Sequence, residues 1–198
     1  MIQVGFELTD FRTGTHTRVI EGPDETDGRG WTTEITCPTG AAPYILEHLH
    51  AGWTETFHVL KGRAFYQVDG KKVELSAGES ITTPPGHKHV HPWNAGDEVM
   101  VFRQVVDCGK RSPDALHDVI GVFATLNGLA KEGKVNGKGL PKNPLQFATT
   151  LRTLVKHEGF DAAAPVGAQR LLAATLGRVG EMMGYKAVDP RYVSGDGS

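Results

Sequence analysis

The sequence predicts a mainly β fold, an antiparallel sandwich or barrel, followed by an α-helical C-terminal extension. In the first part of the chain, short segments rich in β-branched and aromatic residues recur at roughly 8–12-residue spacing, separated by Gly, Pro and Asp turn signals. No helical pattern lies between them, so the strands are expected to be antiparallel. From residue 110 onward, apolar residues recur at helical spacing instead. We therefore expect a β part at residues 1–109 and a helical part at residues 110–198.

The expected strands are short and end at clear turn signals. Asp69-Gly70 has the pattern of a two-residue hairpin turn. Residues 21–30 are polar and Gly-rich, which indicates an exposed loop, and residues 1–30 show no helical periodicity. The expected strand segments are WTTEIT, PYILEHLH, TETFHVLKG, RAFYQVDG, KKVELSAG, ESITTPPG, HVHPW and EVMVFRQVVD.

The extension is expected to hold three helices. The first begins near Ser112-Pro113, where Ser can cap a helix and Pro can take its first position. A basic, Gly-rich connector at residues 131–143 separates it from helices expected at residues 145–156 and 166–183. These helices are expected to pack on the outside of the β part or on a partner subunit. Because arginines lie among the Leu and Ala residues of the last helix, binding to a membrane surface is the alternative to packing for this helix.

Composition describes an ordinary soluble protein without a nucleic-acid partner. The 198 residues carry a net charge of −2. The two parts of the chain differ in the sign of their net charge. Residues 1–109 hold 9 Lys+Arg and 15 Asp+Glu, whereas residues 110–198 hold 12 Lys+Arg and 8 Asp+Glu. The two cysteines, Cys37 and Cys108, show no CxxC spacing. With no signal peptide and no apolar run of membrane-spanning length, a cytoplasmic protein is expected.

Histidines cluster in the β part, where six of the nine fall between His48 and His91. Alternate residues of a strand share a face, so His48 and His50 are expected to point the same way, with Cα atoms about 6.6 Å apart. Four residues that include Gly52 then allow the chain to reverse and bring Glu55 beside them on the next strand. Two imidazoles and a carboxylate can therefore converge.

A third histidine, His89, follows the Pro84-Pro85-Gly86 turn at the start of another strand. Three neutral imidazoles and one carboxylate suit a single Fe, Mn, Ni, Cu or Zn ion and leave coordination positions open for chemistry. A closed structural zinc site would more typically use Cys, and neither Cys lies near the cluster in sequence. The alternative is a set of surface histidines without a metal.

These residues resemble the two metal-binding motifs of the cupin superfamily. His48, His50, Glu55 and Gly62 match its first motif, G-x5-H-x-H-x(3,4)-E-x6-G, although Ala42 takes the place of the leading Gly. The second motif, G-x5-P-x-G-x2-H-x3-N, is matched by a further set, and its final Asn position is a Trp followed by Asn. That set is Gly78, Pro84, Gly86 and His89.

The resemblance covers residues 31–107 and implies a jelly-roll barrel with the metal inside, held by His48, His50, Glu55 and His89. Since short edge strands gain cover from a partner, it also implies a homodimer. Strand alternation places Phe57 and Val59 on the inner face with Glu55, while His58 faces away.

Three more residues are candidates for the substrate pocket. His91 shares the inward parity of His89 and could support a ligand, exchange a proton with substrate, or be a histidine satisfied by a core hydrogen bond. Tyr66 has the parity of inward residues in the family pattern, and its hydroxyl is either a polar contact or part of the core. Trp53, in the turn between the ligands, flanks the entrance or packs in the core.

Fold alone does not decide the reaction, because the superfamily includes dioxygenases, decarboxylases, isomerases, cyclases and binding proteins. We expect a mononuclear metalloenzyme acting on a small organic substrate, with Fe(II) dioxygenase-like chemistry favoured over isomerase, cyclase or lyase chemistry. The alternatives are a non-catalytic small-molecule-binding or regulatory cupin with a structural metal, and an interaction protein that uses the helical extension.

Overall fold

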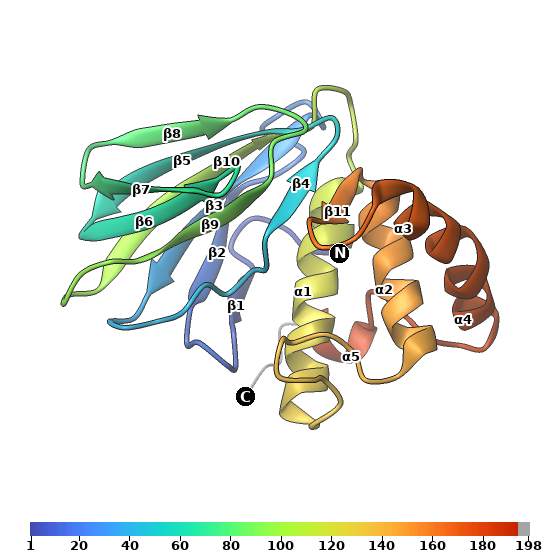
Figure 1. Cartoon of the computed structure of the whole chain (residues 1–198). Coiled ribbons are helices and arrows are strands. Elements are labelled where there is room, and N and C mark those ends of the chain that lie inside the picture. Colours follow the sequence, from blue (N-terminus) through green and yellow to red (C-terminus); the bar gives the residue numbers. More distant parts are fainter. Residues whose placement is uncertain (194–198) are drawn as a thin grey trace.

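A computed structural model describes residues 1–193 as two antiparallel sheets with helices on one side (Figure 1). The larger sheet has the order β1-β2-β3-β10-β5-β8, and the smaller has the order β11-β4-β9-β6-β7. The two sheets are not closed into a continuous barrel, but their arrangement fits a cupin-type jelly roll. The strands are β1 (Glu7–Thr9), β2 (His16–Glu21), β3 (Gly30–Cys37), β4 (His48–His50), β5 (Thr54–Lys61), β6 (Arg63–Val68), β7 (Lys71–Ser76), β8 (Ser80–Thr83), β9 (His89–Asn94), β10 (Met100–Asp107) and β11 (Gly159–Asp161).

The helices lie close to where the sequence predicts them. Asn143 caps α2 by accepting hydrogen bonds from the N–H groups of Leu145 and Gln146, and Pro144 takes the first helical position. The expected last helix contains a π-helical stretch between two α-helical pieces. None of the helices in residues 1–193 has the length and apolar character needed to cross a bilayer. The elements are α1 (Ala115–Lys131), α2 (Pro144–Lys156), α3 (Val166–Leu172), the π-helix Ala173–Gly177, α4 (Arg178–Met182) and α5 (Pro190–Val193).

Three strands of the β part differ from the sequence prediction. β1 and β2 add two strands beyond β3, in a region where alternation is weak because only Val19 of β2 is fully buried. β4 is shorter than the segment PYILEHLH, and only its last three residues pair as a strand. The Asp69-Gly70 turn is confirmed, since both residues have positive φ and β6 and β7 pair directly on either side.

The core has two hydrophobic clusters that serve different purposes. One lies among the strands and is built from Ile35, Phe57, Tyr66 and Phe102 together with smaller residues. The other joins the sheets to α1, because it combines sheet and turn residues with one face of that helix. Its members are Ile2, Val19, Trp31, Trp53, Val106, Cys108, Ala115, Leu116, Val119 and Ile120. The helical extension therefore shares a core with the β part.

The extension also contributes a strand to the smaller sheet. β11 pairs antiparallel with β4, so that Gly159 lies opposite His50 and Asp161 lies opposite His48. Figure 1 shows β11, α1 and α2 gathered beside β4. The helices do not simply cover the outside of the β part: they lie next to the strand that carries two of the candidate ligands.

Both thiols are buried and free. Burial raises the pKa of Cys37 to about 11 and that of Cys108 to about 12. They are therefore protonated at neutral pH and lack the thiolate that reactive cysteines need.

An ion-pair cluster ties α1 to the end of α2. Asp118 Oδ2 lies 2.7 Å from Lys156 Nζ and 2.7 Å from His157 Nε2. Burial raises the pKa of Asp118, but the hydrogen bonds from His157 and Lys156 outweigh it and lower that pKa to about 2. The ionised carboxylate is therefore the form that the folded chain stabilises.

We expect Asp118→Asn to lower the free energy of unfolding at pH 7 by about 1–2 kcal/mol. A depressed carboxyl pKa stabilises the fold above the unfolded value near 3.8, and this contribution is lost as the pH falls toward about 2. The difference between variant and wild type should therefore shrink between those two pH values. Urea unfolding at pH 7 and at low pH measures it. Asp114→Asn, at an exposed carboxylate, is the control, and an effect of Asp118→Asn that does not change with pH would contradict the assignment.

Candidate metal centre

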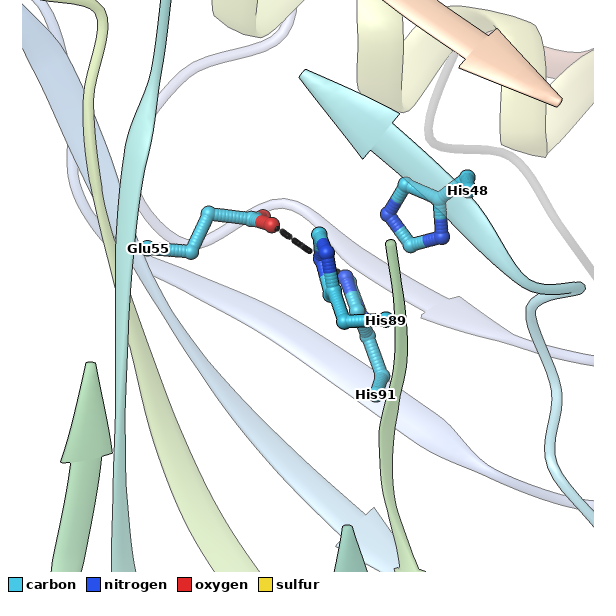
Figure 2. Close-up of side chains that lie close together, drawn as sticks. All are labelled: His48, Glu55, His89 and His91. Atoms are coloured by element: carbon cyan, nitrogen blue, oxygen red, sulfur yellow. Dashed lines mark hydrogen bonds and ion pairs between the residues drawn. The ribbon is translucent and has the colours of Figure 1, made fainter. Parts of the chain in front are cut away.

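Side chains from both sheets converge on one buried point (Figure 2). Glu55 comes from β5 of the larger sheet, whereas His48 comes from β4 and His89 and His91 from β9 of the smaller sheet. One ligand atom from each of the four lies within 4.8 Å of the others. Figure 2 shows the Glu55 carboxylate pointing across the gap toward the imidazoles. Such a group could hold a metal ion.

The Glu55 carboxylate is the centre of the contacts. Its Oε2 lies 2.6 Å from His89 Nε2 and 3.4 Å from His50 Nε2, and its Oε1 lies 3.6 Å from His91 Nε2. Gln104 of β10 donates from Nε2 to Oε1 over 2.6 Å and so orients the carboxylate. Glu55 is only 2% exposed. A buried carboxylate of this kind needs positive or hydrogen-bonding partners, and His89 and Gln104 supply the two hydrogen bonds.

Backbone carbonyls fix the orientation of two imidazoles. His48 Nδ1 lies 2.8 Å from the carbonyl oxygen of Leu46, and His89 Nδ1 lies 3.1 Å from that of His87. A carbonyl only accepts, so Nδ1 carries a proton in both rings. His48 Nε2 is left with a lone pair, whereas His89 Nε2 donates its proton to Glu55 Oε2 over 2.6 Å and would release it to bind a metal ion. The ring nitrogens that face the centre are therefore the ones able to bind a metal ion, an arrangement typical of metal-binding histidines.

His91 reaches the centre from the same face of β9 as His89. Its Nδ1 lies 3.0 Å from the hydroxyl of Tyr44. Its Nε2 is buried and has no hydrogen-bond partner among the described residues. A buried polar atom without a partner is costly, so this nitrogen indicates that a further group belongs beside it. Either a metal ion or a polar atom of a bound substrate would satisfy it.

His50 lies beside the four-residue group rather than within it. Its ring stacks on Trp53, with centroids 4.4 Å apart and planes 15° apart, and packs edge-on against His48. Its Nδ1 is also buried without a hydrogen-bond partner among the described residues. His50 thus adds a fifth candidate ligand side chain at the edge of the group.

Burial and mutual contacts favour the protonation states that bind metals. Burial raises the pKa of Glu55, yet His50 and the hydrogen bonds from the histidines lower it well below its usual range. Burial lowers the pKa of His48 strongly and also that of His91, with the neighbouring imidazoles adding to the effect. His89 is the exception, because burial lowers its pKa but the hydrogen bond and charge of Glu55 outweigh burial and raise it. This ring therefore holds a proton that metal binding would displace. An ionised carboxylate and imidazole nitrogens are the donor set that suits a divalent transition metal.

The centre opens onto a cavity of about 700 Å³. His48, His50, Glu55, His91 and Gln104 line one part of it, together with Trp53. The remaining wall comes largely from the helical extension and β11. Pockets of this size hold small organic molecules. The structure therefore places a candidate binding cavity beside the candidate metal centre.

The pocket residues expected from strand parity fall into two groups. Trp53 and His91 line the cavity. Phe57, Val59 and Tyr66 point inward and are fully buried, but they belong to the core cluster and are not among the residues that line the cavity. The Tyr66 hydroxyl is hydrogen-bonded to Thr83. Side chains packed tightly between the sheets leave no room for a ligand at that depth.

The sequence did not point to two residues of the site, Tyr44 and Gln104. Gln104 had a usable signal, because it is a polar residue at an inward position between buried Phe102 and Val106. Tyr44 lies in the irregular segment before β4, where no periodicity indicates the direction of a side chain.

The fold and the histidine–glutamate cluster define a protein of the cupin type, with a jelly roll whose interior carries a possible metal site. Residues 34–107 match the family Cupin_2, described as a cupin domain. The chain therefore carries a cupin domain. Among curated proteins, a comparison finds no match.

Solved structures similar to the chain are cupin proteins of low sequence identity. A "predicted oxalate decarboxylase" from Thermotoga maritima is 19% identical, with a TM-score of 0.47, and the match covers 52% of this chain and 91% of that one. A protein with a double-stranded β-helix domain from Klebsiella pneumoniae is 23% identical, with a TM-score of 0.40 and coverages of 57% and 85%. A sugar phosphate isomerase from Silicibacter pomeroyi is 19% identical, with a TM-score of 0.40 and coverages of 46% and 59%.

Proposed function

We propose that this chain is a metal-dependent cupin enzyme that acts on a small organic substrate. One observation carries the proposal: a group of three imidazoles and a carboxylate, whose ligand atoms lie within 4.8 Å of one another, opens onto a cavity of about 700 Å³. A structural metal would not need a cavity beside it. A non-catalytic binding or regulatory cupin remains the alternative.

His48, Glu55 and His89 of this group, together with His50 at its edge, are the residues that would hold one divalent transition-metal ion, which leaves His91 for the substrate. When bound, the ion would supply Lewis-acid or redox chemistry to a substrate in the cavity. His91 lines the cavity, and its unpartnered Nε2 is the atom that would accept or donate a proton at the substrate. Tyr44 would hold the His91 ring in place through its Nδ1.

Fe(II) dioxygenase-like chemistry is the reaction that we put first, and isomerase, cyclase or lyase chemistry with the same ligands comes second. We also propose that the chain works in the cytoplasm as a homodimer. The short strands β1 and β8 at the edges of the larger sheet support the dimer, since a partner would cover them.

Metal analysis of protein purified without a metal-affinity resin tests this function. We expect about one transition-metal ion per chain, lost in His48→Ala and retained in His58→Ala, the control on the outward face of β5. Bound iron together with oxygen consumption would support the oxygenase, whereas another metal would favour the isomerase, cyclase or lyase. Wild-type protein that carries no transition metal and takes up none in titration would overturn the proposal.

A further inference from the structure

We infer that the cavity takes a predominantly apolar, neutral organic molecule with one small polar end, which would lie at the metal centre. Only the placement of the polar end at the metal centre rests on the proposed function. It follows from the walls that the helical extension builds, from the pairing of the charged side chains in those walls, and from the position of the histidine–glutamate cluster.

The cavity wall opposite the cluster is largely apolar. α1, α2, β11 and α3 all contribute to it, although they lie outside the part of the chain that matches the cupin family. Aromatic and aliphatic side chains from the β part continue the same surface. The apolar lining from the extension comprises Val119, Ile120, Phe123, Leu126, Leu140, Phe147, Leu151, Leu154, Phe160 and Leu172.

Several of these side chains keep exposed surface even though they face the interior. Phe123, Leu126, Phe147, Leu154 and Leu172 are only partly buried. Apolar surface of this kind is stabilised when a ligand displaces the water against it. An apolar ligand body would complete the packing of the helices, whereas a hydrophilic ligand would leave this surface unmatched.

The cations in the cavity wall offer little to an anionic ligand. Arg12 donates to Asp10 Oδ2 over 3.1 Å and to the carbonyl oxygen of Tyr44 over 3.1 Å. Lys138 is exposed on the connector. A phosphate or a dicarboxylate is normally held by cations that are free to form charge-assisted bonds. Within the described part of the chain, this cavity does not provide a buried, unpaired one.

Two carboxylates in the wall are also engaged within the protein. Glu47 accepts a hydrogen bond from Gln67 Nε2 over 2.9 Å, and Asp161 accepts one from the N–H of Ala163 over 2.7 Å. They are therefore not arranged to select a cationic ligand. Specific polar contacts are left to the cluster itself, where His91 Nε2 is buried without a partner. This arrangement admits one small polar group, such as a hydroxyl or a carbonyl.

Binding of the neutral fluorescent probe N-phenyl-1-naphthylamine to the full chain tests the inference. We expect the probe to bind at one per chain and to accept excitation energy from Trp31 and Trp53, which both line the cavity. Ala168→Trp, at an exposed cavity-lining position of α3, should weaken binding by about tenfold or more because the indole fills the space. Leu171→Trp, on the same helix but outside the cavity lining, should leave binding unchanged.

Polar probes and metal-free protein separate this inference from the proposed function. Oxalate and glucose 6-phosphate should not displace the fluorescent probe, and wild-type protein stripped of metal by a chelator should still bind it, since the apolar wall does not depend on the metal. Absence of probe binding, equal weakening by both Trp variants, or displacement by either polar probe would overturn the inference. Wild-type protein that takes up no transition metal but still binds the probe would overturn only the proposed function.

Discussion

The substitution Glu55→Gln should lower the metal affinity of the protein by about 100-fold or more. Loss of a residue that merely supports a ligand costs roughly 10–100-fold, and Glu55 is the only anion among the five converging side chains. Its carboxylate contacts imidazoles from both β4 and β9, so no neighbour can take its place. Titration of metal-free protein with Co²⁺ or Zn²⁺, followed by calorimetry or absorbance, measures the change.

Gln is the right replacement because it can preserve the hydrogen bonds of the site. Its amide oxygen can accept from Gln104 Nε2, and its amide nitrogen can donate to Nε2 of a His89 ring that is neutral once the carboxylate is gone. The variant therefore removes the charge with little change in packing. A circular dichroism spectrum like that of the wild type would confirm that the fold is kept.

Glu47→Gln is the matched control. Glu47 lines the same cavity and is partly buried, but it lies outside the four-residue group and pairs with Gln67 instead. Its loss should leave metal affinity close to that of the wild type. Equal affinities in the Glu55 and Glu47 variants would show that Glu55 does not bind the metal.

Motif spacing predicted that His48, His50, Glu55 and His89 would converge because the residues involved are tied to local geometry. The His48-x-His50 repeat follows from strand alternation, and the turn before Glu55 brings the next strand back alongside. The structure places His91 in the group of four and His50 at its edge, with both side chains directed at Glu55. Alternation predicted that His91 would point inward, but it could not show how close two histidines on different strands come to one carboxylate.

The wall of the cavity could not be predicted from the sequence. Helical periodicity predicted α1 and α2 and their apolar faces, but periodicity does not show what an apolar face contacts. The three-residue strand β11 is too short to give an alternation signal, yet its pairing with β4 brings the extension to the metal centre. Contacts between elements far apart in the sequence, such as those of α1 with β3, depend on tertiary packing alone.

Trp53→Ala should cost about 3–5 kcal/mol in the free energy of unfolding, the range for truncating a buried Trp. Trp53 is only 4% exposed and packs edge-on against Trp31, with ring centroids 5.3 Å apart. Both belong to the cluster that joins the sheets to α1. Removal of the indole therefore opens a void between the β part and the extension. Urea unfolding at neutral pH measures the loss.

Trp93→Ala separates this effect from the general cost of losing an indole. Trp93 lies on β9, is only partly buried, and packs on Phe65 rather than on the helices. Its removal should cost clearly less than that of Trp53. Trp53 also stacks on His50, so Trp53→Ala should weaken metal binding as well, while Trp93→Ala should leave it unchanged. Equal losses of stability and of metal affinity in the two variants would show that Trp53 does not couple the helical extension to the metal centre.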